Sequence, residues 1–528
     1  MRIRRGLRYT VALSVVLVAA LLPSPVSGSA IIDVTTNADE YDTTGSGTGC
    51  ALREAVQAAN TDAAFGGCPA GSGNDIIRLK ATTYLLSRHG SGAGNITGDL
   101  DTLAVLTIVG KSKSTTIING DAADRIFENT GGGSLTLRRM TITNGKSPTA
   151  GGAIKSVGGK LTVSDAIISA SEAGGTGGGI DASSGTVLLQ RLVVTGNKAS
   201  GRGGGVALYT GGPAAKATIE DTTVSLNTAS PTYAGAGISN GTGTDLTLRR
   251  STLTQNHGGA GDGLFNDGSA TLRNVTISGN GNNTEGGVGG GISNEGSVLL
   301  INVTISGNLA SNQGGDGGNI YNAGAISAKN TLVYEALTSG NCGGTPLVSL
   351  GHNLDYAASS SYPCFTNADP TNVFGDPLLG PLQDNGGLTQ TQALGAGSTA
   401  LNKGVVVTGM STDQRGAPRP SGPKPDIGAY ERASCHGVLV NLVGTDSADT
   451  ITGTSGPDGI LGRGGNDTIN GAGGNDGICG GPGNDRLSGG PGNDVLDGQA
   501  GNDNLFGGTG IDTCIQGPGT GIRSSCEH

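Results

Sequence analysis

The chain has 528 residues, of which 100 are glycine, and it contains no tryptophan and only 3% aromatic and 14% charged residues. A conventional globular core holds more aromatic residues, and this much glycine without a collagen period is typical of repeats that turn in every short unit. Apolar residues still make up 35% of the chain and recur at regular intervals, which excludes disorder. The formal net charge of −10 argues against a nucleic-acid partner.

The N-terminal segment has the features of an export signal. Four arginines within the first eight residues precede an apolar stretch at 11–22, and small residues follow at 28–30. The apolar stretch is shorter than the roughly 20 residues that a membrane-spanning helix needs. We therefore predict a signal peptide over residues 1–30 and an extracellular protein, secreted or held at the cell surface, with no membrane span after signal removal. A membrane anchor is the alternative.

The segment CALREAVQAAN at 50–60 is expected to form a short amphipathic helix. Leu52, Val56 and Ala59 are spaced three to four positions apart and therefore share one face. At the open end of a stack of strands, such a helix would cover edges that otherwise pair with other chains. We interpret residues 31–100 as an N-terminal cap, with Arg53 and Glu54 as structural rather than catalytic residues.

Residues 101–345 repeat one pattern of short apolar runs. An apolar anchor recurs at similar intervals, at Ile142, Ile168, Val194, Val224, Leu253, Ile277, Ile305 and Val333. Two further apolar series precede the anchors in the same register. A glycine-rich turn after each of the first seven anchors closes on one apolar residue, namely Ile154, Ile180, Val206, Ile238, Leu264, Ile292 and Ile320.

This alternation predicts strands with one buried face. No single unit can bury its apolar face alone, so the units must stack around one continuous core. Leucine-rich repeats share the repeat length, but their Leu and Asn spacing is absent. The sequence therefore predicts an all-β fold, a right-handed parallel β-helix of the pectate-lyase-like solenoid type.

Asparagines recur in the same register. One row follows the anchors and a second precedes them: Asn197, Asn227, Asn256, Asn280 and Asn308, and Asn274, Asn302 and Asn330. Stacked amides can hydrogen-bond along a solenoid and tolerate its tight turns. We favour such a ladder over a ligand-binding stripe.

Motifs near both ends of the solenoid carry a family resemblance. The segment CALREA at 50–55 resembles the CSLREA signature of exported bacterial β-helix proteins, with Ala51 in place of the usual Ser. The segments GLTQT at 387–391, TDQRG at 412–416 and DIGAYE at 426–431 are similar to the closing segment of this family, whose members are often labelled choice-of-anchor Q proteins. The resemblance implies the fold and export but no reaction. It leads us to interpret 346–433 as a closing cap in which Asp413, Arg415 and Glu431 are structural.

Residues 434–528 carry a nine-residue repeat and a concentrated negative charge. From 436 to 528 there are eleven acidic and three basic residues, a balance of −8. The unit GGPGNDRLS at 480–488 fits GGxGxDxUx and resembles the RTX repeat of secreted bacterial proteins. Aspartate recurs at every ninth position, at Asp449, Asp458, Asp467, Asp476, Asp485, Asp494, Asp503 and Asp512.

The spacing predicts a parallel β-roll in which two nonapeptides make one coil. Carboxylates two nonapeptides apart then stack in two rows, and such rows repel unless a cation lies between successive turns. Ca²⁺ takes six to eight oxygen ligands and suits carbonyl-rich turns. We predict calcium as the cofactor, held by these eight aspartates and by the turn glycines Gly464, Gly473, Gly481, Gly483, Gly490 and Gly492. We further expect folding of the tail to require calcium.

In the first two units, GTDSADTIT and GTSGPDGIL, Thr replaces the second glycine. These units can cap the roll instead of binding calcium.

Eight cysteines in an exported chain suggest disulfides. Local pairing suggests Cys50–Cys68 and Cys342–Cys364. Cys435–Cys479 and Cys514–Cys526 are weaker pairings. The spacings do not match a zinc site.

Two functions remain open at this stage. The favoured one is a non-catalytic surface, adhesion or matrix protein with a calcium-stabilised tail and a polysaccharide or cell-surface ligand. The alternative is a carbohydrate-active enzyme, a lyase, hydrolase or epimerase, on the β-helix face. Acids clustered with Arg or His on one face would favour the enzyme. No catalytic residue is assigned, and Asp99 and Asp101 are interpreted as structural.

Overall fold

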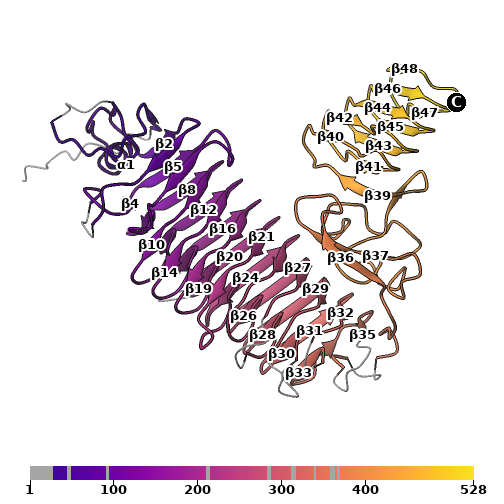
Figure 1. Cartoon of the computed structure of the whole chain (residues 1–528), viewed down its shortest axis with the longest axis horizontal. Coiled ribbons are helices and arrows are strands. Elements are labelled where there is room, and N and C mark those ends of the chain that lie inside the picture. Colours follow the sequence, from indigo (N-terminus) through magenta and orange to yellow (C-terminus); the bar gives the residue numbers. More distant parts are fainter. Residues whose placement is uncertain are drawn as a thin grey trace, which may run out of the picture.

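The computed structural model describes residues 28–44, 49–90, 94–209, 215–281, 287–310, 317–337, 340–356, 363–365 and 369–528. Residues 1–27 of the predicted signal peptide lie outside this range. Within it, no helix is long and apolar enough to cross a membrane. The described residues form a long parallel β-helix and a C-terminal parallel β-roll (Figure 1), which confirms the predicted fold class.

The β-helix stacks short parallel strands in columns. The first column, in chain order, consists of β1 (Ile31–Asp33), β2 (Asn74–Arg78), β5 (Val105–Val109), β8 (Ser134–Arg138), β12 (Lys160–Ser164), β16 (Thr186–Gln190), β20 (Ala215–Glu220), β24 (Thr244–Arg249), β27 (Ser269–Ser278), β29 (Ser297–Ser306), β31 (Ala325–Lys329) and β34 (Val348–Ser349). The second consists of β3 (Thr83–Leu85), β6 (Ile117–Asn119), β9 (Thr141–Thr143), β13 (Ile167–Ser169), β17 (Val193–Thr195), β21 (Thr223–Ser225), β25 (Thr252–Thr254), the ends of β27 and β29, β32 (Leu332–Tyr334) and β35 (Leu354–Tyr356).

A separate sheet forms another face of the solenoid, and a shorter sheet forms one edge. The face consists of β4 (Leu100–Thr102), β7 (Phe127–Asn129), β11 (Ile154–Val157), β15 (Ile180–Ser183), β19 (Val206–Tyr209), β23 (Ile238–Asn240), β26 (Leu264–Asn266), β28 (Ile292–Asn294), β30 (Ile320–Asn322) and β33 (Cys342–Gly344). The edge consists of β10 (Lys146–Ser147), β14 (Glu172–Ala173), β18 (Lys198–Ala199) and β22 (Thr228–Ala229).

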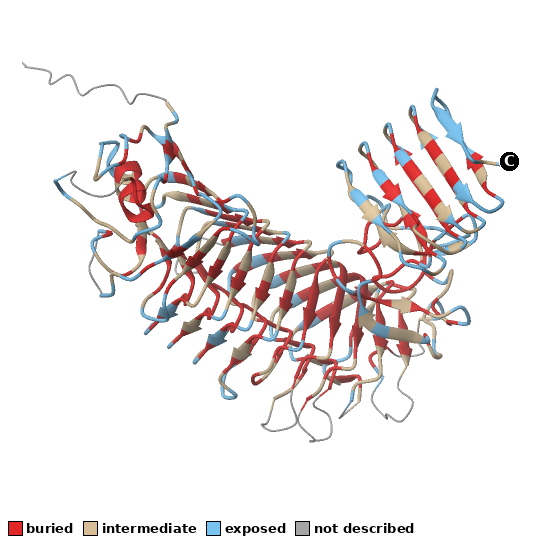
Figure 2. Cartoon of the chain, turned by 45° about the horizontal axis from the view of Figure 1, so that its top comes forward, coloured by how far each residue is buried: buried red, intermediate tan, exposed pale blue. Residues whose placement is uncertain are grey.

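Strand register confirms the sequence alignment of the repeats. Ile142 pairs with Ile168, and Ile168 pairs with Val194. The apolar residues that follow the glycine-rich turns pair in the same way, for example Ile154 with Ile180. All of these residues are fully buried. The inward side chains therefore form one core along the solenoid, and Figure 2 shows buried residues in every rung.

The asparagines form buried ladders. Asn227 donates from Nδ2 to Asn256 Oδ1 at 3.0 Å, and Asn256 donates to Asn280 at 2.9 Å. All three are inaccessible to solvent, so the first row cannot be a ligand-binding stripe. The second row is also bonded, with Asn330 donating to Asn302 at 2.9 Å. A third ladder, absent from the sequence interpretation, joins Asn240, Asn266, Asn294 and Asn322.

Helix α1 (Leu52–Thr61) lies at the N-terminal end of the solenoid, against β2 and β4. Glu54 accepts hydrogen bonds from the backbone N–H groups of Ala51 and Asp42. Arg53 is fully buried, pairs with Asp39 at 2.7 Å and donates to the Gly98 carbonyl. Both side chains therefore hold the helix in place.

Residues 385–431 pack along the flank of the solenoid. Gln414 bonds to Thr252 and Thr276, and Asn274 donates to the Thr412 carbonyl at 2.9 Å. Asp413 and Arg415 form a fully buried ion pair of 2.9 Å. A hairpin of β36 (Leu379–Gln383) and β37 (Thr391–Leu394) leads into this segment.

The roll has two sheets that face each other across a thin apolar core. Their strands are parallel except for the first, Ser434–Cys435, which pairs antiparallel with the next strand. One consists of β38 (Ser434–Cys435), β39 (Val438–Val443), β41 (Gly459–Leu461), β43 (Gly477–Pro482), β45 (Val495–Ala500) and β47 (Thr513–Ile515). The other consists of β40 (Thr450–Thr452), β42 (Thr468–Asn470), β44 (Arg486–Pro491), β46 (Asn504–Thr509) and β48 (Ile522–Ser524). The core is Ile460, Ile469, Ile478, Leu487, Leu496, Leu505 and Cys514.

All four suggested disulfides are present. They are Cys50–Cys68, Cys342–Cys364, Cys435–Cys479 and Cys514–Cys526. The third joins β38 to β43 and so ties the start of the roll to its middle.

Candidate calcium-binding roll and side-chain clusters of the β-helix

The aspartates of the roll stack in two rows, each row taking every second nonapeptide. In the first row, the N–H of Asp467 donates to Asp485 Oδ1 at 2.8 Å, and the N–H of Asp485 donates to Asp503 Oδ1 at 2.9 Å. In the second row, Asp476 and Asp494 donate in the same way to the next aspartate. One carboxylate oxygen of each is thus committed to the backbone of the preceding coil.

The second carboxylate oxygen has no partner at six of the eight positions. Each of these Oδ2 atoms is buried and accepts no hydrogen bond: Asp467, Asp476, Asp485, Asp494, Asp503 and Asp512. Buried polar atoms are nearly always satisfied in folded proteins, so six unpartnered carboxylate oxygens in register indicate a cation-binding site. Carboxylate and carbonyl oxygens are the donors that Ca²⁺ prefers, and these residues fit that ion.

The first two turns differ from the rest. Asp449 Oδ2 accepts from the Thr445 hydroxyl at 2.9 Å, and Asp458 Oδ2 accepts from the Thr454 hydroxyl at 3.0 Å. Each also accepts from the backbone N–H of the same threonine. The threonines that replace glycine therefore satisfy the oxygens that are orphaned elsewhere, which supports a capping role for these units.

The other end of the roll is closed by a glutamate. Glu527 Oε2 accepts from the N–H of Asp512 at 2.7 Å, which is the contact that the next aspartate would otherwise make. The sequence interpretation did not include Glu527, because it lies outside the nine-residue period.

Turn glycines allow the coils to approach closely. A Cβ at Gly481, whose φ is +113°, would lie 1.6 Å from the Arg463 carbonyl oxygen of the coil before it. A Cβ at Gly483 would lie equally close to the Gly465 carbonyl. Gly490 and Gly492 repeat both contacts in the next nonapeptide. No side chain fits at these four predicted positions without moving the stack.

Gly464 and Gly473 are less constrained than predicted. The nearest atoms to a Cβ at these positions lie 3.7 and 3.8 Å away. The crowded positions are the next glycines along the chain, Gly465 and Gly474. A Cβ at either of them would lie 2.5 Å from backbone atoms of the preceding coil. Both hold the same place relative to the row aspartate as Gly483, so alignment on the aspartate would have identified them.

Burial changes the acidity of the stacked carboxyls. Desolvation raises the pKa of Asp476 and of Asp485 to about 6, and the neighbouring aspartates of the same row add to the rise. Desolvation also raises the pKa of Asp467, Asp494 and Asp503. The rows therefore resist ionisation unless a cation compensates them.

Residues 443–478 and 480–514 match the family described as RTX calcium-binding nonapeptide repeat (4 copies). The C-terminal roll therefore carries RTX-type nonapeptide repeats. The RTX match covers the six orphaned carboxylates and both threonine-capped turns. No curated protein matches the chain.

Among solved structures, the chain is similar to pectate lyase Pel9A at 16% identity and a TM-score of 0.43, over 77% of this chain and 96% of that one. It is also similar to PL6 family alginate lyase AlyGC, at 12% identity and a TM-score of 0.26, over 84% of this chain and 68% of that one.

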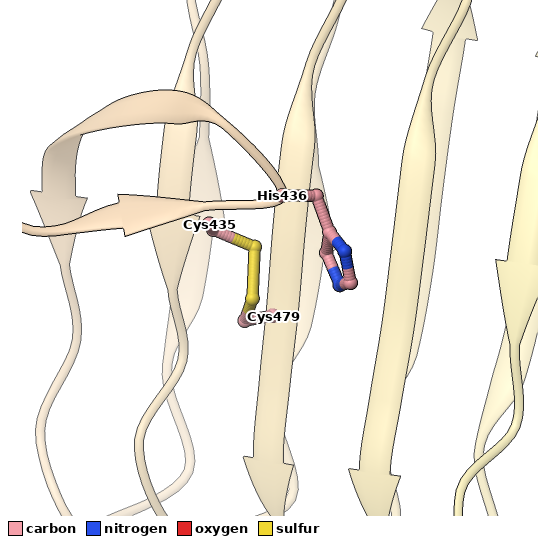
Figure 3. Close-up of side chains that lie close together, drawn as sticks. All are labelled: Cys435, His436 and Cys479. Carbon is pink, nitrogen blue, oxygen red and sulfur yellow. A yellow bond between two sulfur atoms is a disulfide. The ribbon is translucent and has the colours of Figure 1, made fainter.

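In the RTX roll, the sulfur atoms of Cys435 and Cys479 and a ring nitrogen of His436 lie close enough together to hold one metal ion (Figure 3). The two sulfurs form a disulfide and offer no thiolate to a metal. His436 Nε2 instead contacts Asp497 Oδ2 at 3.0 Å. The cluster therefore links the start of the roll to β43 covalently and to β45 by a polar contact.

A second cluster lies on the β-helix, on the face formed by β4, β7 and β11. Asp101, Glu128 and Lys155 stand in register on consecutive strands. Lys155 pairs with Glu128 at 2.8 Å, and Arg125 pairs with Glu128 and, at 2.8 Å, with Asp99. Burial raises the pKa of Asp99 to about 7 despite the nearby arginine.

This cluster was not found from the sequence, because Glu128 and Lys155 come from different rungs and belong to no motif. Part of it has a structural role: Asp101 Oδ2 accepts from the N–H of Gly94, and the Asp101 N–H donates to Asn95. The side chains of Glu128 and Lys155 are only partly exposed, at 20% and 26%.

Proposed function

We propose that the chain is a secreted, calcium-dependent binding protein of the cell surface or extracellular matrix, in which the β-helix is a rigid scaffold. One observation carries this proposal: the six buried carboxylate oxygens without partners, in a fold whose asparagine rows are satisfied. A folded roll at neutral pH then depends on millimolar calcium, the concentration range of extracellular calcium modules. Four disulfides agree with an oxidising compartment.

The N-terminal signature, residues 1–30 and the closing motifs complete the proposal. We assign export to a signal peptide at 1–30, and we assign the chain to the CSLREA, choice-of-anchor Q group on the motifs at 50–55, 387–391, 412–416 and 426–431. The domain order is then a cap at 31–100, a β-helix at 101–345, a closing segment at 346–433 and the RTX roll at 434–528.

The test is a polysaccharide screen of the mature chain with calcium and with a chelator. Retention and newly formed reducing or unsaturated chain ends are scored in the same samples. Calcium-dependent retention without cleavage is the expected result. Retention that is unchanged by the chelator, with a roll that stays folded, contradicts the role of calcium.

The cluster of Asp99, Glu128, Arg125 and Lys155 favours a second candidate function, cleavage or epimerisation of a polysaccharide. A carboxyl with a pKa of about 7 beside an arginine can exchange protons at neutral pH. Glu128→Gln and Lys155→Met each remove one charge from this cluster. Cleavage by the parent chain that both variants lose would establish the enzyme and displace the first proposal.

A further inference from the structure

A groove runs where three parts of the chain meet. Its β-helix wall holds Arg191 and Arg250, its closing-segment wall holds Thr412 and Gln414, and its roll wall is residues 444–447 with Arg463. The main space is about 480 Å³, and an adjoining space of about 290 Å³ shares Arg250 and Thr412 with it. The second space adds Arg249 and Arg273 to the lining.

The groove concentrates positive charge on an acidic chain. Arg250 forms ion pairs with Glu220 and, at 2.8 Å, with Asp221. Glu220 also forms an ion pair with Arg249 at 3.3 Å. One carboxylate is therefore shared by two guanidinium groups. Arg191 pairs with Asp165 at 2.5 Å on the preceding rung.

Two arginines of the lining are less well compensated than Arg250, since Arg249 only shares the carboxylate of Glu220. Arg249 and Arg273 stand in register on neighbouring strands, so their like charges lie one rung apart. Among the described residues, Arg273 has no carboxylate partner, and its guanidinium contacts Met410 Sδ at 3.7 Å. The Arg249 Nε is buried and donates no hydrogen bond. An unsatisfied buried donor beside a guanidinium without a carboxylate partner indicates an anion-binding site.

The shape and lining select the kind of anion. Guanidinium forks bind carboxylate or sulfate groups in two-point geometry. Successive rungs are about 4.8 Å apart, close to the length that one sugar adds to an extended polysaccharide. Thr412 and Ser447 can bond to hydroxyl groups. No aromatic side chain among the described residues lines the groove, which disfavours the base stacking of single-stranded nucleic acid.

We propose that this groove binds an acidic polysaccharide, with Arg249 and Arg273 contacting its carboxylate or sulfate groups. The inference rests on the proposed binding function and names its ligand. The roll completes the groove: Arg463 pairs with Asp446 at 2.8 Å, Val443 accepts from the Gly387 N–H, and Val440 accepts from Arg415. Calcium that folds the roll therefore raises affinity at a site that holds no calcium itself.

The test compares the full mature chain with the double variant Arg249→Gln/Arg273→Gln. The control is Arg138→Gln/Arg139→Gln, which removes the same charge from exposed positions at an earlier rung. Probes are oligogalacturonate too short to gel with calcium, a sulfated dextran oligosaccharide, neutral dextran and a single-stranded DNA oligonucleotide. Binding is measured by calorimetry in millimolar calcium and in chelator, and circular dichroism verifies folding of each variant.

The parent and the control are expected to bind one or both acidic sugars, and the groove variant is expected to lose at least about tenfold in affinity. Preference between carboxylate and sulfate probes identifies the anionic group. Equal binding by the parent chain, the control variant and the groove variant would show that the groove is not the binding site, but it would leave the proposed calcium-dependent binding function intact. Tighter binding of DNA than of any sugar, or no binding of acidic sugars by a folded parent chain, would overturn the ligand assignment.

Discussion

In the β-helix, the buried polar ladders that run from rung to rung are neutral amides, whereas in the RTX roll they are carboxylates. Asn256 both donates to and accepts from its neighbours, so its ladder satisfies itself. Asp485 can only accept, and one of its oxygens is left without a donor. A row of amides therefore satisfies its own hydrogen-bond donors and acceptors, whereas a row of aspartates needs a cation. The same stacking geometry yields a scaffold independent of metal in one region and a metal-dependent module in the other.

The largest expected effect is the removal of calcium. Chelation should unfold the RTX roll while the β-helix stays folded, because the uncompensated carboxylate rows lie in the roll. Hydrogen exchange read by mass spectrometry should show fast exchange over 444–515 and unchanged protection in β12, β16 and β20. Equal loss of protection in both regions would show that the two fold as one unit.

The second prediction separates binding turns from capping turns within one aspartate row. Asp485→Asn keeps the Oδ1 acceptor but replaces the orphaned oxygen with an amide. It should raise the calcium concentration for half-folding by at least about tenfold, because ligand charge sets calcium affinity. Asp449→Asn is the matched control, since Thr445 already satisfies that carboxylate, and should change the midpoint far less. Equal shifts in a calcium titration followed by circular dichroism would refute the capping role.

The third prediction concerns acid. A raised folded-state pKa means that protonation favours the folded metal-free roll, so its stability should increase as the pH falls from 7 through about 6 and on toward 4. Calcium affinity should change in the opposite direction, because protons compete for the same carboxyls. Circular dichroism at several pH values, in chelator and in calcium, measures both trends. A metal-free roll that loses structure on mild acidification would contradict the assignment.

The smallest expected effect lies in the β-helix. Asn256→Ala should lower the free energy of unfolding by about 1–3 kcal/mol, because it leaves the Asn227 N–H and Nδ2 without their acceptor and removes the Nδ2 donor to Asn280 Oδ1. Calcium should not alter this loss. The control is Lys216→Ala, at an exposed strand position of the same solenoid. Urea denaturation followed by far-UV circular dichroism gives both values, and a loss equal in the two variants would argue against the ladder.

The repeat-bearing parts of the fold could be predicted because stacking leaves a period in the sequence. The anchor series around Ile142 and Ile168 became strand partners as aligned, and the nine-residue aspartate period became two rows. Sites built across repeats left no such signal. Lys155 reaches Glu128 only because β11 pairs with β7, and Arg273 stacks on Arg249 only because β27 pairs with β24.

The sequence by itself determined the β-helix, the roll, two of the Asn ladders and the aspartate rows, since each follows from a short period and from side-chain chemistry. Only the tertiary structure decided which carboxylate oxygens stay unpartnered. It also placed Thr445 and Glu527 at the ends of the aspartate rows, brought the closing segment against the arginines of β24 and β27, and brought the roll near Arg191 and Arg250. These outcomes depend on contacts between residues far apart in the chain, and sequence spacing does not encode such contacts.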